Sequence, residues 1–160
     1  MDAQIEVGAV GPGDLEQLQT WMNLEDLRYF HRRVARPGSG SVLIARSGGV
    51  AVGALFVSWD VADEPQVRER LAGVPIIFRL RVAARFRRQG IATALVRQAE
   101  SMVRKRGHAR VLVGVDRRNF AARALYGRLG YELRTDLTGI RGVQGPYDIF
   151  VADLRGPIDS

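Results

Sequence analysis

The residues from Arg87 to Ala92 (Arg-Arg-Gln-Gly-Ile-Ala) have the types and spacing of a site that binds an anion. They stand directly before a helical pattern, and the first N–H groups of a helix have no intrahelical acceptor and lie at the positive end of its dipole. Gly90 lets the backbone approach a bound group closely, and Ala92 is too small to block it. Arg85 and the two arginines of the stretch add positive charge. This combination predicts a site for a diphosphate.

Two regular elements must flank this loop to position it. The segment from Ile76 to Val82 alternates, with Ile76, Phe78, Leu80 and Val82 on one face, and this pattern predicts a strand. After the loop, apolar residues recur at helical spacing, charged residues take the other side, and Gly107 marks a usual stopping point. The apolar positions are Ile91, Leu95, Ala99, Met102 and Val103, and the charged ones are Arg97, Glu100, Arg104 and Lys105. We therefore expect a strand, a short basic loop and a helix of about four turns.

Two better-known phosphate-binding loops fit this stretch poorly. A Walker loop has Lys-Ser or Lys-Thr after its last glycine, but Gly90 is followed by Ile91 and Ala92. The dinucleotide fingerprint needs three glycines at set spacing and a distal acid, and only one glycine is present. An ordinary surface loop rich in arginine is the remaining alternative, so the prediction needs support from elsewhere in the chain.

A second motif supplies that support. It follows Val111–Asp116, a predicted buried strand, and has the form N-x-x-A-x-x-x-Y-x-x-x-G-[FY], matched by Asn119, Ala122, Tyr126, Gly130 and Tyr131. The first motif has the form [RQ]-x-x-G-x-[GA], matched by Arg87, Gly90 and Ala92. With both motifs in this order, about thirty residues apart, the chain resembles the GNAT superfamily of N-acetyltransferases. The resemblance covers most of the second half closely and the first half only in the order of its elements.

The resemblance implies an α+β fold, layered α/β/α, with a central mixed, mostly antiparallel sheet of about six to seven strands and helices on both faces. We expect residues 1–160 to form a single domain of this kind, because the length suits one domain with a core of its own. Asp14 is the predicted N-cap of the first helix, and Thr138–Pro146, rich in glycine, is predicted to be a loop. The other predicted elements are the strands Gln4–Val10, Ser41–Arg46, Val50–Trp59, Tyr131–Arg134 and Tyr147–Leu154, and the helices Leu15–Met22, Leu24–Val34, Gln66–Leu71 and Phe120–Leu129.

The same resemblance implies direct transfer of an acetyl group from acetyl-CoA, as co-substrate, to a primary amine of a small molecule or peptide. The pantetheine arm would add to the strand by β-augmentation, through the main chain of Leu80, Arg81 and Val82. The pyrophosphate would be bound mainly by backbone N–H groups of Arg87, Arg88, Gln89, Gly90, Ile91, Ala92 and Thr93. In the family, the asparagine at position 119 holds the cofactor arm and the tyrosine at position 126 lies near the sulfur as general acid. A phenol suits that role because its ordinary pKa of about 10 keeps it protonated at neutral pH.

Several of these residues also have a purely structural interpretation. Asn119 could be only an N-cap for its helix. Tyr126 shares a helix face with Ala122 and Leu129 and could be a core residue. The aromatic residues Trp21, Tyr29, Phe30 and Trp59 could either line an acceptor pocket or belong to the core.

The acceptor must lose a proton before it attacks, because an ammonium group has no lone pair. Many family members place a glutamate on the strand equivalent to Ile76–Val82, and here that strand has no acid. Asp60 and Glu64, with Asp63 between them, lie at the end of the preceding strand and in its loop and are the predicted base, acting through water. His31 is a weaker candidate, and a solvated surface position is the alternative for each of these residues.

Positive charge is concentrated in one part of the chain. Between Arg79 and Arg134, fourteen arginines and one lysine stand against three acids, an excess of +12, whereas the whole chain carries +7 and the remainder therefore −5. The excess lies where an anionic cofactor would bind, and the acidic remainder favours a cationic acceptor. A basic nucleic-acid-binding domain is an alternative, although only Phe86 and Phe120 interleave the arginines as stacking groups. A non-catalytic acyl-CoA sensor is the other alternative.

The composition excludes further classes. The chain has no cysteine, so disulfides, thiolate metal sites and acyl-cysteine chemistry are excluded, and no metal is expected. No apolar run approaches the length of a membrane span, and the first residues lack the pattern of an export signal. We therefore expect a cytoplasmic enzyme without membrane association, and the family resemblance is compatible with a homodimer.

Overall fold

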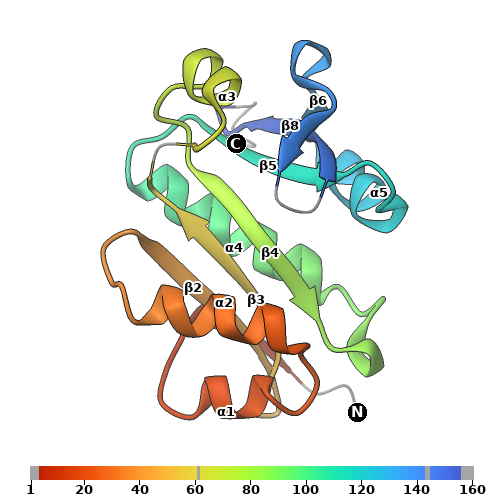
Figure 1. Ribbon diagram of the computed structural model, residues 1–160. Coiled ribbons are helices and arrows are strands. Elements are labelled where there is room, and N and C mark those ends of the chain that lie inside the picture. Colours follow the sequence, from red (N-terminus) through yellow and green to blue (C-terminus); the bar gives the residue numbers. More distant parts are fainter. Residues whose placement is uncertain (1–3, 61, 143–144, 156–160) are drawn as a thin grey trace. The chain divides into compact units, whose positions relative to one another are not determined.

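The computed structural model describes residues 4–60, 62–142 and 145–155. Within that range the chain forms two compact units (Figure 1). The first contains the described residues up to Ser58 together with Phe78–Ser101, and the second contains the described residues of 59–77 and those from Met102 on. Strand β4 (Ile76–Val82) and helix α4 (Ile91–Lys105) contribute residues to both units.

The first unit contains a sheet with the strand order β1-β2-β3-β4. Its strands are β1 (Ile5–Ala9), β2 (Gly40–Ser47), β3 (Val50–Ser58) and the part of β4 from Phe78 to Val82. β1 pairs antiparallel with β2, and β2 with β3. The predicted hairpin between β2 and β3 turns at Gly48 and Gly49, whose φ angles of 56° and 83° suit glycine. Eight of the nine residues of β3 are buried, as expected for a strand covered on both faces.

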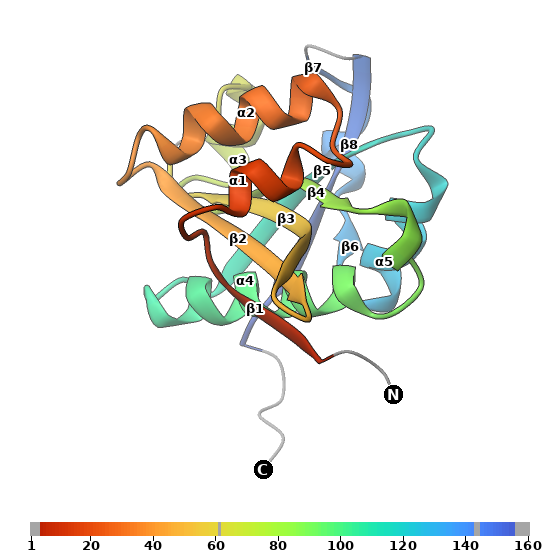
Figure 2. The same cartoon turned by 90° about the horizontal axis from the view of Figure 1, so that it is seen from below.

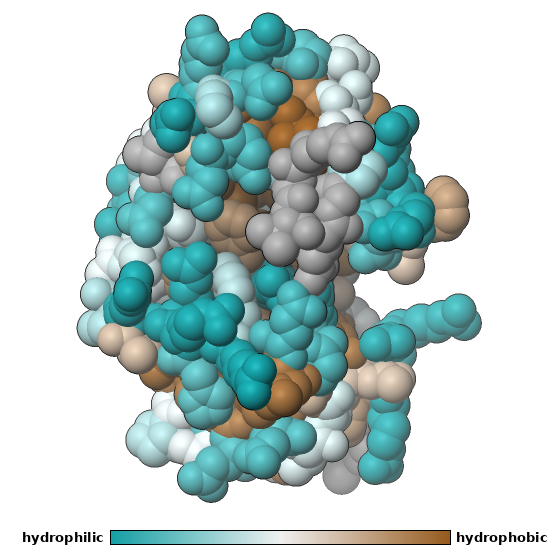
Figure 3. Space-filling model, viewed as in Figure 1, coloured by the Kyte–Doolittle hydropathy of each residue, from teal (hydrophilic) through white to brown (hydrophobic). Residues whose placement is uncertain are grey.

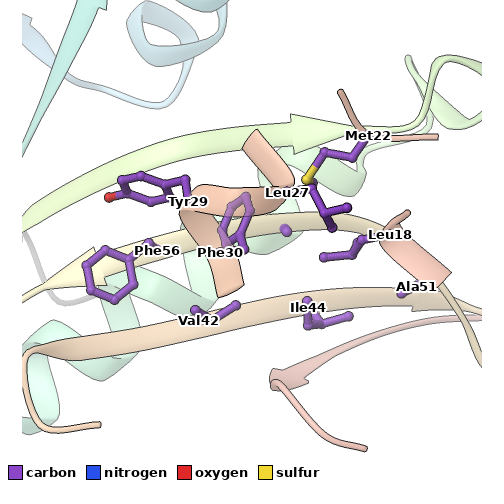
Figure 4. Close-up of a cluster of buried hydrophobic side chains, with 10 residues drawn as sticks. Leu18, Met22, Leu27, Tyr29, Phe30, Val42, Ile44, Ala51 and Phe56 are labelled. Atoms are coloured by element: carbon purple, nitrogen blue, oxygen red, sulfur yellow. The ribbon is translucent and has the colours of Figure 1, made fainter. Parts of the chain in front are cut away.

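Helices cover both faces of this sheet (Figure 2). The short α1 (Asp14–Leu18) and the longer α2 (Leu24–Val34) lie on one face, and α4 lies on the other. The side chains between α1, α2 and the sheet form a buried cluster (Figure 4), made of Leu18, Met22, Leu27, Tyr29, Phe30, Val42, Ile44, Ala51, Ala54 and Phe56. This cluster fixes α2 against the strands.

Gly53 of β3 makes room for α4 on the opposite face. A Cβ atom at this position would lie 3.0 Å from Leu95 Cδ1 and 3.1 Å from Ile91 Cγ2. Contacts this short are tighter than ordinary van der Waals contacts, so the missing side chain sets how closely the first turns of α4 approach the strand.

The second unit is built around β5 (Arg110–Asp116) and β8 (Gly145–Asp153), which pair antiparallel. β5 also pairs in parallel with the start of β4 through Ile76 and Ile77. The short strands β6 (Glu132–Leu133) and β7 (Ile140–Gly142) both pair antiparallel with β8. The helices of this unit are α3 (Pro65–Arg70), α5 (Phe120–Arg128) and the single 3-10 turn η2 (Thr135–Leu137). Its core includes Val67, Leu71, Val74, Ile76, Leu112, Leu137, Ile140 and Ile149.

The α+β class and the mixed, mostly antiparallel strand pairing are confirmed, although the described residues contain eight strands where about six to seven were expected. The prediction for α1 was wrong in two respects: the helix is shorter, and its N-cap is Gly13, not Asp14. Asp14 is occupied elsewhere, because its carboxylate binds Arg46 and accepts the N–H of Gly11 at 2.6 Å. The glycine-rich stretch predicted as a loop instead contains β7, which pairs antiparallel with β8; residues 143 and 144 of that stretch lie outside the described residues.

In the part of the chain that the structure describes, no helix combines the length and the apolar character needed to cross a bilayer. The surface over α2 is largely hydrophilic in the view of Figure 3. The single domain of residues 1–160 stays a prediction.

Candidate active site

The predicted anion-binding loop lies in the first unit, between β4 and α4. After a single 3-10 turn, η1 (Ala84–Phe86), the chain passes through two left-handed residues, Arg88 at φ 64° and Gly90 at φ 81°. For an arginine this conformation costs about 1 kcal/mol or more, so it persists only where neighbouring structure enforces it. Helix α4 then starts at Ile91, and the N–H of Ala94 bonds to the carbonyl of Gly90 at 3.0 Å.

Two side chains of this loop bond to the backbone of the residues just before it. Arg87 Nε donates to the carbonyl of Val82 at 3.3 Å, and Gln89 Nε2 donates to the carbonyl of Arg85 at 3.3 Å. Of the seven predicted pyrophosphate ligands, the exposed ones are Arg87, Arg88, Gln89 and Gly90, the half-buried ones are Ala92 and Thr93, and the buried one is Ile91. The loop thus offers four exposed residues, two of them arginines, at the start of a helix, which fits a phosphate group.

Strand β4 departs from the predicted alternation at Arg79. This residue has a left-handed φ of 56°, which is rare for a side chain other than glycine. Before it, Ile76 and Ile77 are both buried, whereas Phe78 is 36% exposed, so the predicted apolar face of the strand is interrupted. The irregularity comes directly before Leu80, Arg81 and Val82, the predicted pantetheine ligands, which are all half-buried. Unfavourable backbone conformations of this kind concentrate at functional sites.

Asp26, in the first turn of α2, is bound by two arginines of β4. It is 3% exposed, and its carboxylate accepts from Arg79 Nη1 at 2.7 Å and from Arg81 Nε at 2.6 Å. Burial opposes ionisation, but the hydrogen bonds from Arg81 and Arg79 outweigh it and hold the pKa of Asp26 below its ordinary value. Asn23 completes the group, donating from Nδ2 to the same carboxylate at 3.1 Å. Asp26 therefore ties α2 to the irregular part of β4.

Tyr29 lies one turn further along α2, beside the same strand. Its ring centroid is 4.6 Å from Cζ of Arg79 and 4.9 Å from Cζ of Arg33, both within cation–π range. Burial raises the pKa of the Tyr29 phenol, although the charge of Arg33, hydrogen bonding from the same guanidinium, and the charges of Arg79 and Arg32 act in the opposite direction. In Figure 4 its hydroxyl points away from the aliphatic side chains of the core cluster.

The second motif lies on α5, in the second unit. Asn119 is the N-cap of this helix, and its Oδ1 accepts from the N–H of Ala122 at 3.1 Å. Its Nδ2 donates to no residue that the structure describes, so capping leaves a donor for a ligand. Tyr126 is only 2% exposed, and its ring contacts that of Tyr131 edge-on, with centroids 5.1 Å apart. Its position is thus compatible with the core interpretation, and its role as general acid stays a prediction.

The predicted base Glu64 has a specific partner in the second unit. The hydroxyl of Tyr147, at the start of β8, donates to Glu64 Oε1. Burial raises the pKa of Tyr147 above its ordinary value, and the Glu64 carboxylate raises it further. Gly114 of β5 accommodates the ring, because a Cβ there would lie 2.9 Å from Tyr147 Cδ2. Asp60 is exposed.

A buried aspartate also organises the second unit. Asp148 of β8 is 3% exposed and accepts from Arg123 Nη1 of α5 at 2.9 Å and from the N–H of Gly139 at 2.8 Å. Burial opposes ionisation, but these hydrogen bonds hold its pKa below the ordinary value. Asp148 therefore connects the helix that carries Tyr126 to the chain that enters β7.

The structure divides the predicted residues between the two units. Leu80–Val82 and Arg87–Thr93 belong to the first, and Asp60, Glu64, Asn119 and Tyr126 belong to the second. His31 is exposed on α2, and Trp59 contacts His108 and Arg106. No group of three potential metal ligands occurs among the residues described.

Sequence reasoning did not identify the roles of Asp26, Arg33, Tyr147 and Asp148. Asp26 could have been suspected from its place three residues after the capping residue Asn23. Its arginine partners are 53 and 55 residues away, and no local pattern connects them.

Comparison with known proteins gives consistent results. A sequence profile of the Acetyltransferase (GNAT) family matches residues 14–131. Among curated proteins, the chain is similar to N-acetyltransferase family 8 member 2 of Rattus norvegicus, with 34% identity over 93 residues, covering 58% of this chain and 39% of the relative. It is also similar to N-acetyltransferase 8F1 of Rattus norvegicus, with 33% identity over 116 residues, covering 68% of this chain and 50% of the relative. The chain thus spans half or less of the length of these relatives.

Among solved structures, the fold is similar to that of the PaiA N-acetyltransferase from Thermoplasma acidophilum, determined in complex with coenzyme A. The TM-score is 0.66 at 15% identity, and the match covers 94% of this chain and 99% of that one. At this identity the likeness shows the fold alone.

Proposed function

The chain belongs to the acetyltransferase (GNAT) family, whose profile spans both motifs, and on that premise we propose that it transfers an acetyl group from acetyl-CoA to a primary amine of a small molecule or peptide. The family match over residues 14–131 carries this proposal. The related fold solved with coenzyme A supports acetyl-CoA as the co-substrate. That co-substrate supplies a thioester whose carbonyl carbon the amine attacks directly.

Binding of the co-substrate is assigned to the first unit. The backbone of Leu80, Arg81 and Val82 pairs with the pantetheine arm, and the loop from Arg87 to Thr93 binds the pyrophosphate. Two observations support this assignment: the loop residues before α4 are exposed, and its turns use left-handed residues at Arg88 and Gly90. Asn119 contributes its free amide donor, and the arginine-rich surroundings attract the anionic co-substrate.

The proton transfers are assigned to the second unit. Glu64 takes a proton from the acceptor ammonium through water, while Tyr147 fixes the position of its carboxylate by hydrogen bonding. Asp60, four residues earlier in the chain, is the second candidate for this base. As the amine forms the new C–N bond and the C–S bond breaks, the leaving thiolate receives the phenolic proton of Tyr126. The nitrogen loses its second proton as the amide forms, and this proton returns to the Tyr126 phenolate. The first ammonium proton thus ends on the base, the phenolic proton ends on the thiol, and Tyr126 is restored.

Two assays, first of acetyl-CoA binding and then of turnover, test this proposal. Isothermal titration should detect acetyl-CoA at low salt, and release of free thiol should follow addition of an amine. Tyr126→Phe should lower kcat by about 100-fold or more, as expected for loss of a general acid, and leave the acetyl-CoA affinity within about threefold. Tyr131→Phe, which alters the neighbouring ring, is the matched control. Equal losses of kcat and affinity in Tyr126→Phe would contradict the assigned role.

The loop has its own matched pair of variants. Gly90 and Gly107 stand at the two ends of α4 with φ of 81° and 88°, and a Cβ added to either would meet no atom within 4 Å. Alanine at either site should destabilise the fold by about 1 kcal/mol through backbone strain. Only Gly90→Ala should also weaken acetyl-CoA binding. An equal loss of acetyl-CoA affinity in Gly107→Ala would contradict the assignment of this loop to the binding site.

Three finer predictions accompany the proposal. The acidic balance outside residues 79–134 favours an acceptor that enters as a cation, as any primary ammonium does. A homodimer is an expectation from the family resemblance, and a cytoplasmic location is an expectation from the composition of the chain. Size-exclusion chromatography with light scattering tests the first of these, and fractionation of the native host tests the second.

A further inference from the structure

The O–H group of Tyr29 has no acceptor among the residues described, because the group that acts on its oxygen, the Arg33 guanidinium, can only donate. Among the residues described, it is the buried side-chain polar atom for which no partner is found, and the residue as a whole is 8% exposed. Buried hydroxyl groups are normally satisfied, because an unpaired one loses its bond to water without replacement. An unpaired donor inside a protein therefore points to a ligand that would satisfy it.

The surroundings of this hydroxyl carry positive charge. Arg33 and Arg79 both place guanidinium groups within 5 Å of the Tyr29 ring centroid, at 4.9 and 4.6 Å. Arg79 and Arg81 share Asp26, and Arg79 also lies 3.7 Å from Glu25. Arg33 has no carboxylate partner among the described residues and rests on the rings of Tyr29 and Phe56. One positive charge therefore remains in excess, and it belongs to Arg33.

The position of this cluster relates it to the proposed reaction. In the proposed function the phosphates of acetyl-CoA bind after Val82, so the pantetheine arm runs back along β4 toward Arg79. The acyl end of the arm therefore comes to lie near Arg79, and the acceptor must approach it there. A cationic group and an unpaired hydroxyl at this point are suited to hold a part of the acceptor that does not react.

We propose that the acceptor is an amine that also carries a carboxylate, and that Arg33 and the Tyr29 hydroxyl bind this carboxylate. The inference rests on the proposed function and specifies its substrate class. A guanidinium pairs with a carboxylate through two parallel hydrogen bonds, and the phenol supplies a third donor. Arg33 can turn toward such a ligand without breaking an ion pair. The same molecule keeps the ammonium group that the acidic remainder of the chain favours, but its net charge is zero, so it differs from the cationic acceptor expected from the sequence.

Paired acids and amides test this assignment directly. Affinities of glycine and phenylalanine, and of glycinamide and phenylalaninamide, are measured by isothermal titration in the presence of saturating coenzyme A, where no transfer occurs. The acids should bind about 10- to 100-fold more tightly than the amides, the range expected for loss of a charged hydrogen-bonded pair. The ratio of kcat/KM values with acetyl-CoA should follow the same order. O-phosphoethanolamine distinguishes a phosphate site, and a preference for it over the amino acids would overturn the carboxylate assignment.

Two variants assign the preference to the named groups. Arg33→Gln should reduce the acid-to-amide ratio to within about threefold, and Tyr29→Phe should reduce it by about fivefold or more. Arg28→Gln is the matched control, because it removes the same charge from an exposed residue of α2 that makes no ring contact with Tyr29 and is not among the charges that act on its phenol. Tyr29→Phe removes an unpaired hydroxyl, so its thermal midpoint should not fall. A lower midpoint with an unchanged ratio would show a purely structural tyrosine and refute the proposal.

The experiment separates this inference from the proposed function. Turnover of amides and acids at equal efficiency would refute the carboxylate site and leave the acetyltransferase in place. Selective binding of acids without turnover of any amine would support the carboxylate site and refute the assigned activity. Equal binding of acids and amides, with or without turnover, would refute the site.

Discussion

Replacing Asp26 with asparagine should weaken the fold of the first unit measurably. The buried carboxylate accepts from Arg79 Nη1 at 2.7 Å and from Arg81 at 2.6 Å (Nε) and 3.3 Å (Nη2). Asparagine has nearly the same shape but no charge, and its amide nitrogen would present a donor to one of the two guanidinium groups. The variant therefore leaves two arginines without a buried counter-charge.

The magnitude follows from the exposure of the partners. A hydrogen bond to a charged group contributes about 1.5–3 kcal/mol when buried. Here the side chains of Arg79 and Arg81 are 23% and 40% exposed and can regain water. The contribution of each hydrogen-bonded arginine to the free energy of unfolding is therefore reduced by solvent screening. We expect a total loss of about 2–3 kcal/mol, or a fall in Tm of about 4–12 °C for a chain of this length.

Urea unfolding followed by circular dichroism measures this loss. Asp153→Asn is the matched control, because Asp153 pairs with Arg155 at the surface, with side chains 57% and 70% exposed. That change should stay within about 0.5 kcal/mol. A loss for Asp26→Asn no larger than for Asp153→Asn would refute the view that Asp26 holds β4 in place.

The pH dependence gives a second check on the same residue. The pKa of Asp26 is lowered in the folded state, so its contribution is complete above the unfolded pKa of about 3.9 and is lost as the pH falls through the lower folded value. The difference between wild type and Asp26→Asn should therefore be constant from about pH 5 to 8 and shrink below about pH 4. A difference that persists unchanged at the lowest pH would contradict ionised Asp26 as its source.

Three further outcomes follow from the structure. Gly40→Ala should prevent folding or cost more than about 3 kcal/mol, because a Cβ there would lie 2.1 Å from the backbone oxygen of Val57, and expression with urea unfolding checks it. Gly127→Ala, inside α5 with no atom within 4 Å, should instead stabilise by about 0.5–1 kcal/mol in the same assay, and a loss would contradict the open space at this position. Glu64→Gln should lower the raised pKa of Tyr147, although burial should still keep this pKa above its ordinary value. Ultraviolet titration of tyrosinate measures the change, and Tyr147→Phe identifies which part of the signal belongs to Tyr147. A titration curve that Glu64→Gln leaves unchanged would contradict the contact between Glu64 and Tyr147.

Much of the architecture was accessible from the sequence because its local signals agree with the fold. Helix α2 has the predicted bounds, Leu24–Val34, since apolar spacing and the break after Val34 both act locally. The strand Ile76–Val82 and the helix beginning at Ile91 also have their predicted positions, and Gly107 takes the left-handed conformation expected after a helix. These elements are specified by neighbours a few residues apart.

The departures have physical causes that are not local. Glu100 was assigned to the polar side of α4 but is 1% exposed and pairs with Arg97 at 2.8 Å, because a carboxylate can be buried when a partner neutralises it. The left-handed backbone at Arg79 breaks the strand alternation, and nothing in Phe78-Arg79-Leu80 signals it. The pair of Glu64 and Tyr147 spans 83 residues. Such contacts depend on tertiary packing, which a periodicity cannot report.

The conformation of Arg79 links its side chain to the shape of its main chain. The guanidinium that binds Asp26 and rests on Tyr29 belongs to the residue whose backbone turns the strand before Leu80. A ligand that draws this guanidinium away from Asp26 would also relax the strand to which the pantetheine arm is assigned. Occupancy of one substrate would then alter the affinity for the other by the same factor in both directions, and a single residue would suffice to make the two binding steps interdependent.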